Sequence, residues 1–225
     1  MTAKSGAWLR HALLAGVPHG FGTRGSEPPR GLVRAKQVHG TRIVEATQRC
    51  DGFVAEADGI VCRTPGLAIA VVTADCMPLL LATPSGVVAA IHAGWRGLAS
   101  GVIAAGIEAL GRIAADADRA VAVIGPHIGA SCYEVDAPVV RALEARFGDA
   151  VAATLRETRP GHHEIALAPL ASLDLVRAGL APERVAIVDD ACTMCDAERF
   201  HSYRRDGPDA GRLFHYVIAA ARSAT

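Results

Sequence analysis

The chain has 225 residues, of which 51% are hydrophobic and 20% are charged, so it has enough apolar material for one substantial core. Its 23 basic and 23 acidic residues give a formal net charge of zero, which argues against a broadly basic nucleic-acid-binding surface and against a long acidic tail. The six cysteines are far fewer than a disulfide-stabilised scaffold of this length would carry.

No apolar stretch reaches the roughly 18 residues that a membrane-spanning helix needs. The longest candidate, residues 67–82, is interrupted by Thr73, Asp75 and Pro78. The N-terminal segment lacks an apolar core of signal-peptide length. We therefore expect one cytoplasmic domain over residues 1–225, with reduced thiols, no membrane contact and a monomeric or small homo-oligomeric state.

Short apolar runs rich in β-branched residues predict strands along the chain. In chain order these runs are residues 32–38, 41–46, 59–62, 67–72, 77–82, 86–92, 120–124 and 184–188. The runs between residues 59 and 92 are almost continuously apolar, which is typical of strands that are covered on both faces.

Helical periodicity appears in three segments, residues 98–113, 138–147 and 169–178. Residues 200–203 and 212–220 predict a closing hairpin around Asp206-Gly207-Pro208. Strands precede helices only in parts of the chain, so we expect a single layered α/β domain with a mixed central β-sheet.

Two short motifs are weak on inspection. Gly20-Phe21-Gly22-Thr23-Arg24-Gly25 matches the dinucleotide-binding pattern, but two prolines follow at positions 28 and 29 in place of a helix, so a turn-rich loop is favoured. Cys192-Thr193-Met194-Cys195 is a single C-x-x-C pair without the second pair of a structural zinc site. Two buried thiols are the favoured interpretation, with a redox motif as the alternative.

Three segments place metal-binding side chains at the ends of apolar strands. They contribute His39, Cys76 and His92, two imidazoles and one thiol. Three protein ligands with one open position are the arrangement of a catalytic zinc site. The spacing alone leaves open whether the three side chains meet, and on spacing alone three separate, satisfied buried residues are the favoured interpretation.

A different chemistry uses the same residues. Cys76 is a candidate nucleophile, with His92 as its base and Asp75 as the carboxylate that orients the base. Neighbouring side chains on a regular strand point to opposite faces, so Asp75 and Cys76 act together only if the backbone turns between them.

The segment Gly94-Trp95-Arg96-Gly97 predicts an anion site. Its glycines permit a close approach to the backbone, a helix is expected to follow, and Arg96 adds positive charge. Trp95 is placed either to stack on an aromatic base or to cover the core. A tight strand-to-helix turn with a solvated Arg96 is the alternative.

Taken together, these segments resemble the laccase-domain family, also called multicopper polyphenol oxidase-like, whose members are described as purine nucleoside phosphorylases. The matching elements are Gly22-Thr23-Arg24-Gly25, Gln37-Val38-His39-Gly40, Ala57-Asp58-Gly59, Thr73-Ala74-Asp75-Cys76-Met77-Pro78-Leu79-Leu80, His92-Ala93-Gly94-Trp95-Arg96-Gly97, Ile124-Gly125-Pro126, Cys132-Tyr133-Glu134-Val135, Cys192-Thr193-Met194-Cys195, and Phe200 with Ser202-Tyr203-Arg204-Arg205-Asp206-Gly207. They occur in the family's order and span nearly the whole chain.

The resemblance implies a cysteine-hydrolase-like α/β fold and a metal, usually zinc, held by His39, Cys76 and His92. It implies phosphorolysis of purine nucleosides to a free base and ribose 1-phosphate, with adenosine deamination and methylthioadenosine phosphorolysis at the same site. Substrate and phosphate are then expected near Gln37, Gly94, Trp95 and Arg96, with Arg24 as a weaker candidate. Asp75 and Cys76 are the catalytic candidates.

Other functions stay open. The laccase label implies copper and phenol oxidation, but no two histidines are spaced as a trinuclear copper centre requires. Copper still binds a single site of two histidines and one cysteine more tightly than zinc does. The remaining alternatives are a cysteine-dependent hydrolase and a non-enzymatic binding protein whose metal is structural and closed by a fourth ligand, with His127 the first candidate.

Overall fold

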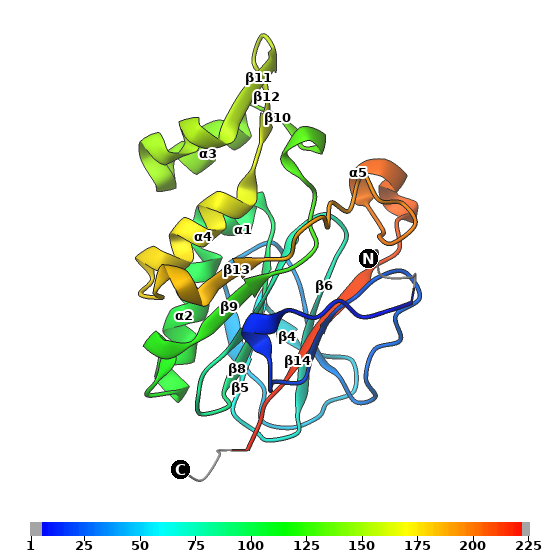
Figure 1. The fold of residues 1–225 in the computed structure, drawn as a ribbon, viewed down its shortest axis with the longest axis vertical. Coiled ribbons are helices and arrows are strands. Elements are labelled where there is room, and N and C mark those ends of the chain that lie inside the picture. Colours follow the sequence, from blue (N-terminus) through cyan, green and yellow to red (C-terminus); the bar gives the residue numbers. More distant parts are fainter. Residues whose placement is uncertain (1–5, 222–225) are drawn as a thin grey trace.

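The computed structural model describes residues 6–221 of the chain. Within these residues the fold has three layers, in which helices cover one face of a mixed sheet and a second mixed sheet covers the other (Figure 1). The layered α/β architecture with a mixed central sheet is therefore confirmed. No helix in the described part of the chain is both long and apolar enough to cross a membrane.

The central layer is a six-stranded sheet in which parallel and antiparallel pairs both occur. In spatial order its strands are Val185–Ile187 (β13), Val121–Ile124 (β9), Met77–Ala82 (β7), Val88–Ala93 (β8), Gly59–Cys62 (β5) and Ile43–Glu45 (β3). All six were predicted from apolar runs. The bounds of β5 and β7 agree with the prediction, β3, β9 and β13 are shorter than predicted, and β8 begins and ends later than predicted.

The second sheet packs against the central one and is also mixed. Its strands, in spatial order, are His19–Phe21 (β1), Leu213–Ile218 (β14), Ala68–Thr73 (β6), Val33–Lys36 (β2) and Phe53–Glu56 (β4). A third, small antiparallel sheet consists of Glu134–Asp136 (β10), His162–Ile165 (β12) and Leu155–Arg159 (β11).

Five α-helices are described within residues 6–221. They are Trp95–Ser100 (α1), Val102–Ile113 (α2), Ala137–Phe147 (α3), Leu167–Arg177 (α4) and Tyr203–Asp206 (α5). The first four lie on one side of the central sheet, and α5 lies apart from them (Figure 1). The predictions for 138–147 and 169–178 are thus confirmed as α3 and α4.

Alternate side chains of β7 enter two different cores. Leu79 and Leu81 pack into the core shared with the helices, whereas Leu80 and Ala82 pack into the core between the two sheets. All four are at most 3% exposed. The continuous apolar run of this strand follows from its central position, because a strand covered on both faces has no solvent-facing side for polar residues.

The single helix predicted for residues 98–113 is wrong. The structure has α1 and α2 with a break at Gly101, whose φ of 91° lies in the left-handed region. The guanidinium of Arg146 would lie 2.8 Å from a Cβ at this position. The left-handed conformation at the break favours glycine, which has no Cβ to clash with its own backbone.

The predicted closing hairpin is also wrong. The first arm, residues 200–203, is not a strand: Tyr203 begins the short helix α5, which is capped by the Ser202 hydroxyl, an acceptor for the Arg205 N–H. Its second arm, β14, pairs antiparallel with β6 and β1 instead. The apolar alternation of β14 was correctly recognised, but its partners are far away in the chain.

Sequence patterns missed several other strands. The segment around Gly20, predicted as a loop, begins in strand β1, where the missing side chain leaves room for the rings of Trp8 and Tyr216. Pro160 and Gly161 form the turn between β11 and β12, two strands that no apolar run predicted. Both cases concern short edge elements with little apolar pattern of their own.

Candidate active site

Strand register brings Cys76 and His92 to one end of the central sheet. In the antiparallel pair β7–β8, Met77 lies opposite Ala93 and Pro78 opposite His92. Cys76 therefore precedes β7 at the point where β8 ends in the Gly94 turn. The loop between β2 and β3 supplies His39, whose φ of 59° turns the chain back over this end.

His39, Cys76 and His92 converge as predicted and form a possible metal site. One donor atom from each lies within 4.8 Å of the others. Cys76 Sγ is 3.9 Å from His39 Nε2, and the imidazole rings of His39 and His92 meet edge to face at 4.9 Å between centroids. We call this group the His–Cys–His centre.

Asp58 fixes the geometry of this centre, a role that the sequence analysis missed. Its carboxylate is fully buried and lies 2.9 Å from His92 Nδ1. It also accepts the backbone N–H groups of Val38, His39 and Gly40 at 3.2, 2.8 and 2.7 Å. The Nδ1–H bond to Asp58 leaves Nε2 of His92 for a metal, an arrangement common among metal-binding histidines.

A signal for Asp58 existed in the sequence. It is a carboxylate directly before the buried strand β5, where an unpaired charge would be costly. The register of β5 and β8, with Gly59 opposite Ile91, then places Asp58 beside His92, whose backbone N–H donates to the Asp58 carbonyl at 2.7 Å. Only the sheet reveals this pairing.

Asp58, His92 and Cys76 polarise one another. Burial raises the pKa of the Cys76 thiol, but hydrogen bonds to His39 and His92 outweigh burial and lower this pKa to about 6. Burial lowers the pKa of His92, but Asp58 and the Cys76 sulfur raise it to about 9. The resulting thiolate is the form of cysteine that binds metals and attacks electrophiles.

Gly94 makes room for the centre. A Cβ on this residue would lie 2.8 Å from Cys76 Sγ and 3.2 Å from His39 Cδ2. The backbone of Gly94 is in an ordinary extended conformation, so the glycine is needed for space and not for its φ angle. Two nitrogen donors and one sulfur donor that lie within 4.8 Å of one another are a set that suits zinc.

Asp75 stands beside the centre but does not orient His92. Its φ of 91° shows that the backbone turns after β6. Such a turn was the condition for Asp75 and Cys76 to act at the same site. However, its carboxylate accepts the Thr193 hydroxyl and the Arg204 N–H, both at 2.6 Å. Asp58 therefore takes the part of the orienting carboxylate that the sequence analysis gave to Asp75.

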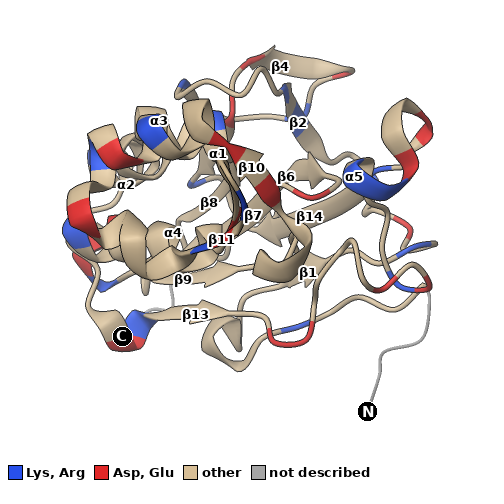
Figure 2. Ribbon diagram, turned by 90° about the horizontal axis from the view of Figure 1, so that it is seen from above, with Lys and Arg blue, Asp and Glu red and all other residues tan. Residues whose placement is uncertain are grey.

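A cavity of about 740 Å³ opens above the His–Cys–His centre. Its walls carry aromatic rings and cationic side chains. The aromatic residues are Phe53, Trp95, Tyr133 and Tyr203, and the cationic residues are Lys36, Arg96, Arg204 and Arg212. Figure 2 shows the basic residues of β2 and α5, the elements that supply Lys36 and Arg204. Phe53 and Tyr203 are 52% and 53% exposed, unusual values for large rings.

Arg96 is the cation in this cavity with the most unused donors. Its guanidinium stacks over the Trp95 ring at 4.5 Å and makes no hydrogen bond or ion pair with another residue of the described chain. The Arg204 guanidinium, in contrast, donates to the Glu134 carbonyl. Arg212 donates to the carbonyls of Ala210 and Gly211.

Two predicted substrate contacts are engaged elsewhere. The Gln37 amide pairs with the backbone of Val72 in both directions at 2.8 Å, so it holds β6 although it also borders the cavity. Arg24 does not line the cavity. It donates to the Phe200 carbonyl and lies 3.5 Å from Asp206.

The expectation of two buried thiols at Cys192 and Cys195 is wrong, because Cys195 is exposed and Cys192 is only partly buried. A third cysteine, Cys132, lies against them.

His127 was the first candidate for a fourth ligand that would close the His–Cys–His centre. It borders a different cavity, together with Cys192 and Cys195.

The fold and the site define a mixed α/β protein with a possible metal centre at the base of an aromatic and cationic cavity. The chain belongs to the family described as multi-copper polyphenol oxidoreductase laccase, whose model matches residues 22–220.

Individual relatives agree with this assignment. A purine nucleoside phosphorylase of Pseudomonas aeruginosa is 38% identical over 170 residues, covering 75% of this chain and 66% of its own length. Another from Streptomyces coelicolor is 39% identical over 196 residues, covering 86% and 76%. The crystal structure of YlmD from Geobacillus stearothermophilus superposes with a TM-score of 0.86 at 27% identity, covering 97% of this chain and 98% of that one.

Proposed function

We propose that this chain is a metal-dependent purine nucleoside phosphorylase, with zinc as the expected metal. The observation that carries the proposal is the single cavity in which the His–Cys–His centre, the unused donors of Arg96 and two exposed aromatic rings meet. The relatives named purine nucleoside phosphorylases support the same activity.

The cavity suits both substrates by size and chemistry. About 740 Å³ lies within the usual range for small-molecule sites. Exposed rings at Phe53 and Tyr203 offer flat apolar faces to a purine base. Arg96 offers a planar guanidinium that matches phosphate oxygens.

Phosphorolysis transfers the ribosyl group from the purine nitrogen to a phosphate oxygen. The C1′–N bond breaks, a C1′–O bond forms, and the electron pair of the broken bond leaves with the purine. Arg96 holds the phosphate beside C1′, which lowers the entropic cost of their meeting. Positive charge and donors that face the departing base stabilise the charge it acquires.

The chain's own residues prepare the metal position. Asp58 holds His92 with Nε2 directed to the centre, and its bonds to three backbone N–H groups hold the His39 loop. Zinc held by His39, Cys76 and His92 would supply Lewis acidity and a more acidic water, and this chemistry is the reason for adenosine deamination as a second proposed activity. Methylthioadenosine is a further proposed substrate for phosphorolysis.

The experiment compares inosine and adenosine, each with and without phosphate, using protein of measured metal content. Hypoxanthine and ribose 1-phosphate from inosine, formed only with phosphate, are the expected products. Inosine formed from adenosine without phosphate is expected if deamination shares the centre. A metal-replete protein that turns over neither nucleoside would contradict the proposal and favour a non-enzymatic binding role.

Cys76→Ser is the matching variant, and Cys50→Ser, at a cysteine outside the centre, is its control. We expect Cys76→Ser to lower kcat/KM by at least roughly 100-fold. Loss of a residue that only hydrogen-bonds a metal ligand usually costs roughly 10–100-fold, and loss of a ligand itself should cost more. Cys50→Ser should retain activity, as measured by product chromatography.

A cysteine-dependent hydrolase is the second candidate, because Asp58, His92 and Cys76 also form a carboxylate–imidazole–thiol series with a thiol pKa of about 6. It predicts activity in chelator-stripped protein that iodoacetamide abolishes and that needs no phosphate. Loss of all activity on stripping alone, with recovery on adding zinc, would exclude this candidate. Recovery with copper alone, together with phenol oxidation, would favour a polyphenol oxidase instead.

A further inference from the structure

Three cysteines from separate parts of the chain meet on the side of the molecule near α5. Cys132 lies at the end of a short 3₁₀ turn, Ala130–Cys132, and Cys192 and Cys195 lie in the loop between β13 and α5. All three sulfur atoms lie within 4.8 Å of one another. Cys132 Sγ and Cys195 Sγ are 2.9 Å apart although 63 positions separate them in the chain.

We propose that Cys132, Cys192 and Cys195 form a second metal site that binds a thiophilic ion, with Zn²⁺ as the expected occupant. We call these residues the three-cysteine cluster. Zinc binds thiolate sulfur at roughly 2.3 Å with tetrahedral geometry, which places ligand sulfurs about 3.8 Å apart. Small side-chain rotations bring the observed sulfurs to that spacing.

The backbone prepares Cys192 to bind as a thiolate. Its sulfur accepts the Gly129 N–H at 3.1 Å, and the N–H groups of Met194 and Cys195 also face it. The C-x-x-C turn thus folds over its own first sulfur. Several N–H donors around one sulfur favour the anion over the neutral thiol, and the anion is the metal ligand.

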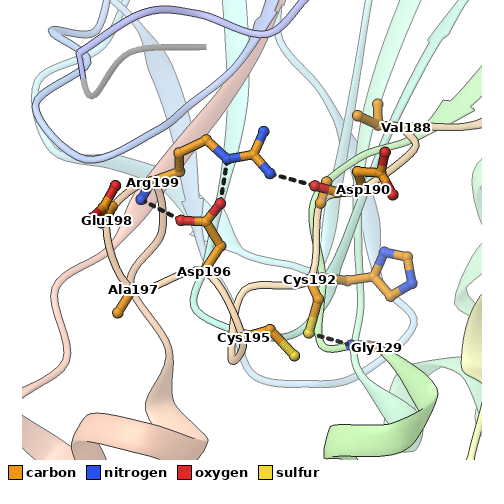
Figure 3. A pocket seen from close by; sticks show the side chains of 11 residues that line it. Gly129, Val188, Asp190, Cys192, Cys195, Asp196, Ala197, Glu198 and Arg199 are labelled. Atoms are coloured by element: carbon orange, nitrogen blue, oxygen red, sulfur yellow. Dashed lines mark hydrogen bonds and ion pairs between the residues drawn. The ribbon is translucent and has the colours of Figure 1, made fainter. Parts of the chain in front are cut away.

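Nearby polar groups leave the cluster's fourth position to solvent or an external ligand. Figure 3 shows Cys192 turned toward Gly129 with Cys195 beside it. The Asp196 carboxylate is paired with Arg199, and His127 Nδ1 faces the Gly125 carbonyl at 2.8 Å. Within residues 6–221 no histidine or acidic side chain joins the three cysteines as a fourth ligand. A cavity of about 790 Å³ opens over Cys192 and Cys195.

A metal in the three-cysteine cluster connects two walls of the candidate active site. Thr193, between two of the ligands, is fully buried and donates to the Asp75 carboxylate at 2.6 Å. Tyr133, next to Cys132, lines the cavity above the His–Cys–His centre. The ion therefore acts as a cross-link that positions Thr193 and Tyr133, and its binding releases the thiol protons to solvent.

The direct test is metal content after purification without chelators under anaerobic conditions. We expect about two zinc ions per wild-type chain and about one per chain in Cys195→Ser and in Cys132→Ser. Cys76→Ser should also hold about one ion, because it loses the other site. Cys50→Ser, the matched control, should match the wild type.

Cobalt titration of stripped wild-type protein keeps the test independent of how the variants fold. Two binding phases are expected, one with the intense thiolate-to-cobalt absorption of several sulfur ligands and one with the weaker absorption of a single sulfur. A single phase, or equal metal content in the wild type and Cys195→Ser, would overturn the proposal. An intact mass lower by two hydrogens in anaerobically purified protein, together with a linked peptide that contains Cys132 and Cys195, would also overturn it, because the two results identify a disulfide between these cysteines.

Discussion

The His–Cys–His centre and the three-cysteine cluster hold their donor atoms by different means. Two donors of the first lie next to paired strands of the central sheet, and a buried carboxylate fixes the third donor's loop. The donors of the second lie on a 3₁₀ turn and a loop, where backbone N–H groups surround one sulfur. We therefore expect the first to be ordered before any ion binds, and the second to depend more strongly on a bound ion for its order.

Among these variants, replacement of Asp58 should produce the largest difference in zinc affinity between the two sites. Asp58→Asn removes the charge that orients His92 and disturbs the acceptor of three backbone N–H groups. We expect the zinc affinity of the His–Cys–His centre to fall by roughly 10–100-fold, while the three-cysteine cluster keeps its affinity. Competition with a chromophoric chelator measures both affinities.

Asp174→Asn is the matched control for this variant. Asp174 is another buried aspartate, 3% exposed, but it pairs with Arg146 at 2.7 Å away from both sites. We expect it to lower the melting temperature without changing either zinc affinity. Equal losses of affinity in the two variants would show that Asp58 acts through general stability.

Gly94→Ala tests whether space at the His–Cys–His centre is as restricted as the structure indicates. The added methyl lies 2.8 Å from Cys76 Sγ, and relief of that overlap should cost about 1 kcal/mol or more. We expect weaker zinc binding at this centre alone. Gly111→Ala is the control, because its methyl lies 4.0 Å from the nearest atom that it would meet and alanine stabilises a helix by about 0.5–1 kcal/mol.

The partly buried thiol of Cys76 should react faster with alkylating agents than the exposed thiol of Cys195. In stripped protein the pKa of partly buried Cys76 is lowered to about 6. In contrast, hydrogen bonds to Cys132 and Cys192, together with burial, raise the pKa of exposed Cys195 to about 12. Because the lowered pKa makes Cys76 a thiolate above about pH 6, its alkylation rate should stop rising near pH 7 and fall as the pH drops through 6.

Iodoacetamide labelling at several pH values, followed by peptide mass spectrometry, measures this difference. Cys195 should react more slowly than Cys76 at neutral pH despite its exposure. A Cys76 rate that keeps climbing above pH 8, as for an ordinary thiol of pKa about 8.5, would contradict the polarised site.

Local patterns predicted the strands of the central sheet and failed at its margins. The run that becomes β7 could be recognised because both of its faces are buried, and this leaves a continuous apolar signal. Neither the break at Gly101 nor the helix α5 is marked by a comparable change in the apolar pattern of the sequence. Gly101 lies beside Arg146, and β14 pairs with β6 and not with residues 200–203, so both differences involve contacts between distant segments.

The sequence by itself indicated which residues are candidates to carry chemistry. His39, Cys76 and His92 stand at the ends of apolar strands, and each is a metal-binding type in a matching motif. It also determined that the protein is layered and has a mixed sheet, because strand and helix patterns are set by residues close together in the chain.

Only the tertiary structure decided which groups support those residues. Asp58 beside His92, Thr193 on Asp75, and Cys132 against Cys195 are contacts between segments separated by 34, 118 and 63 positions. Such contacts depend on strand register and on the path of connecting loops. A shift of one residue in a strand turns its side chains to the opposite face. Local sequence patterns therefore cannot predict which distant group each side chain contacts.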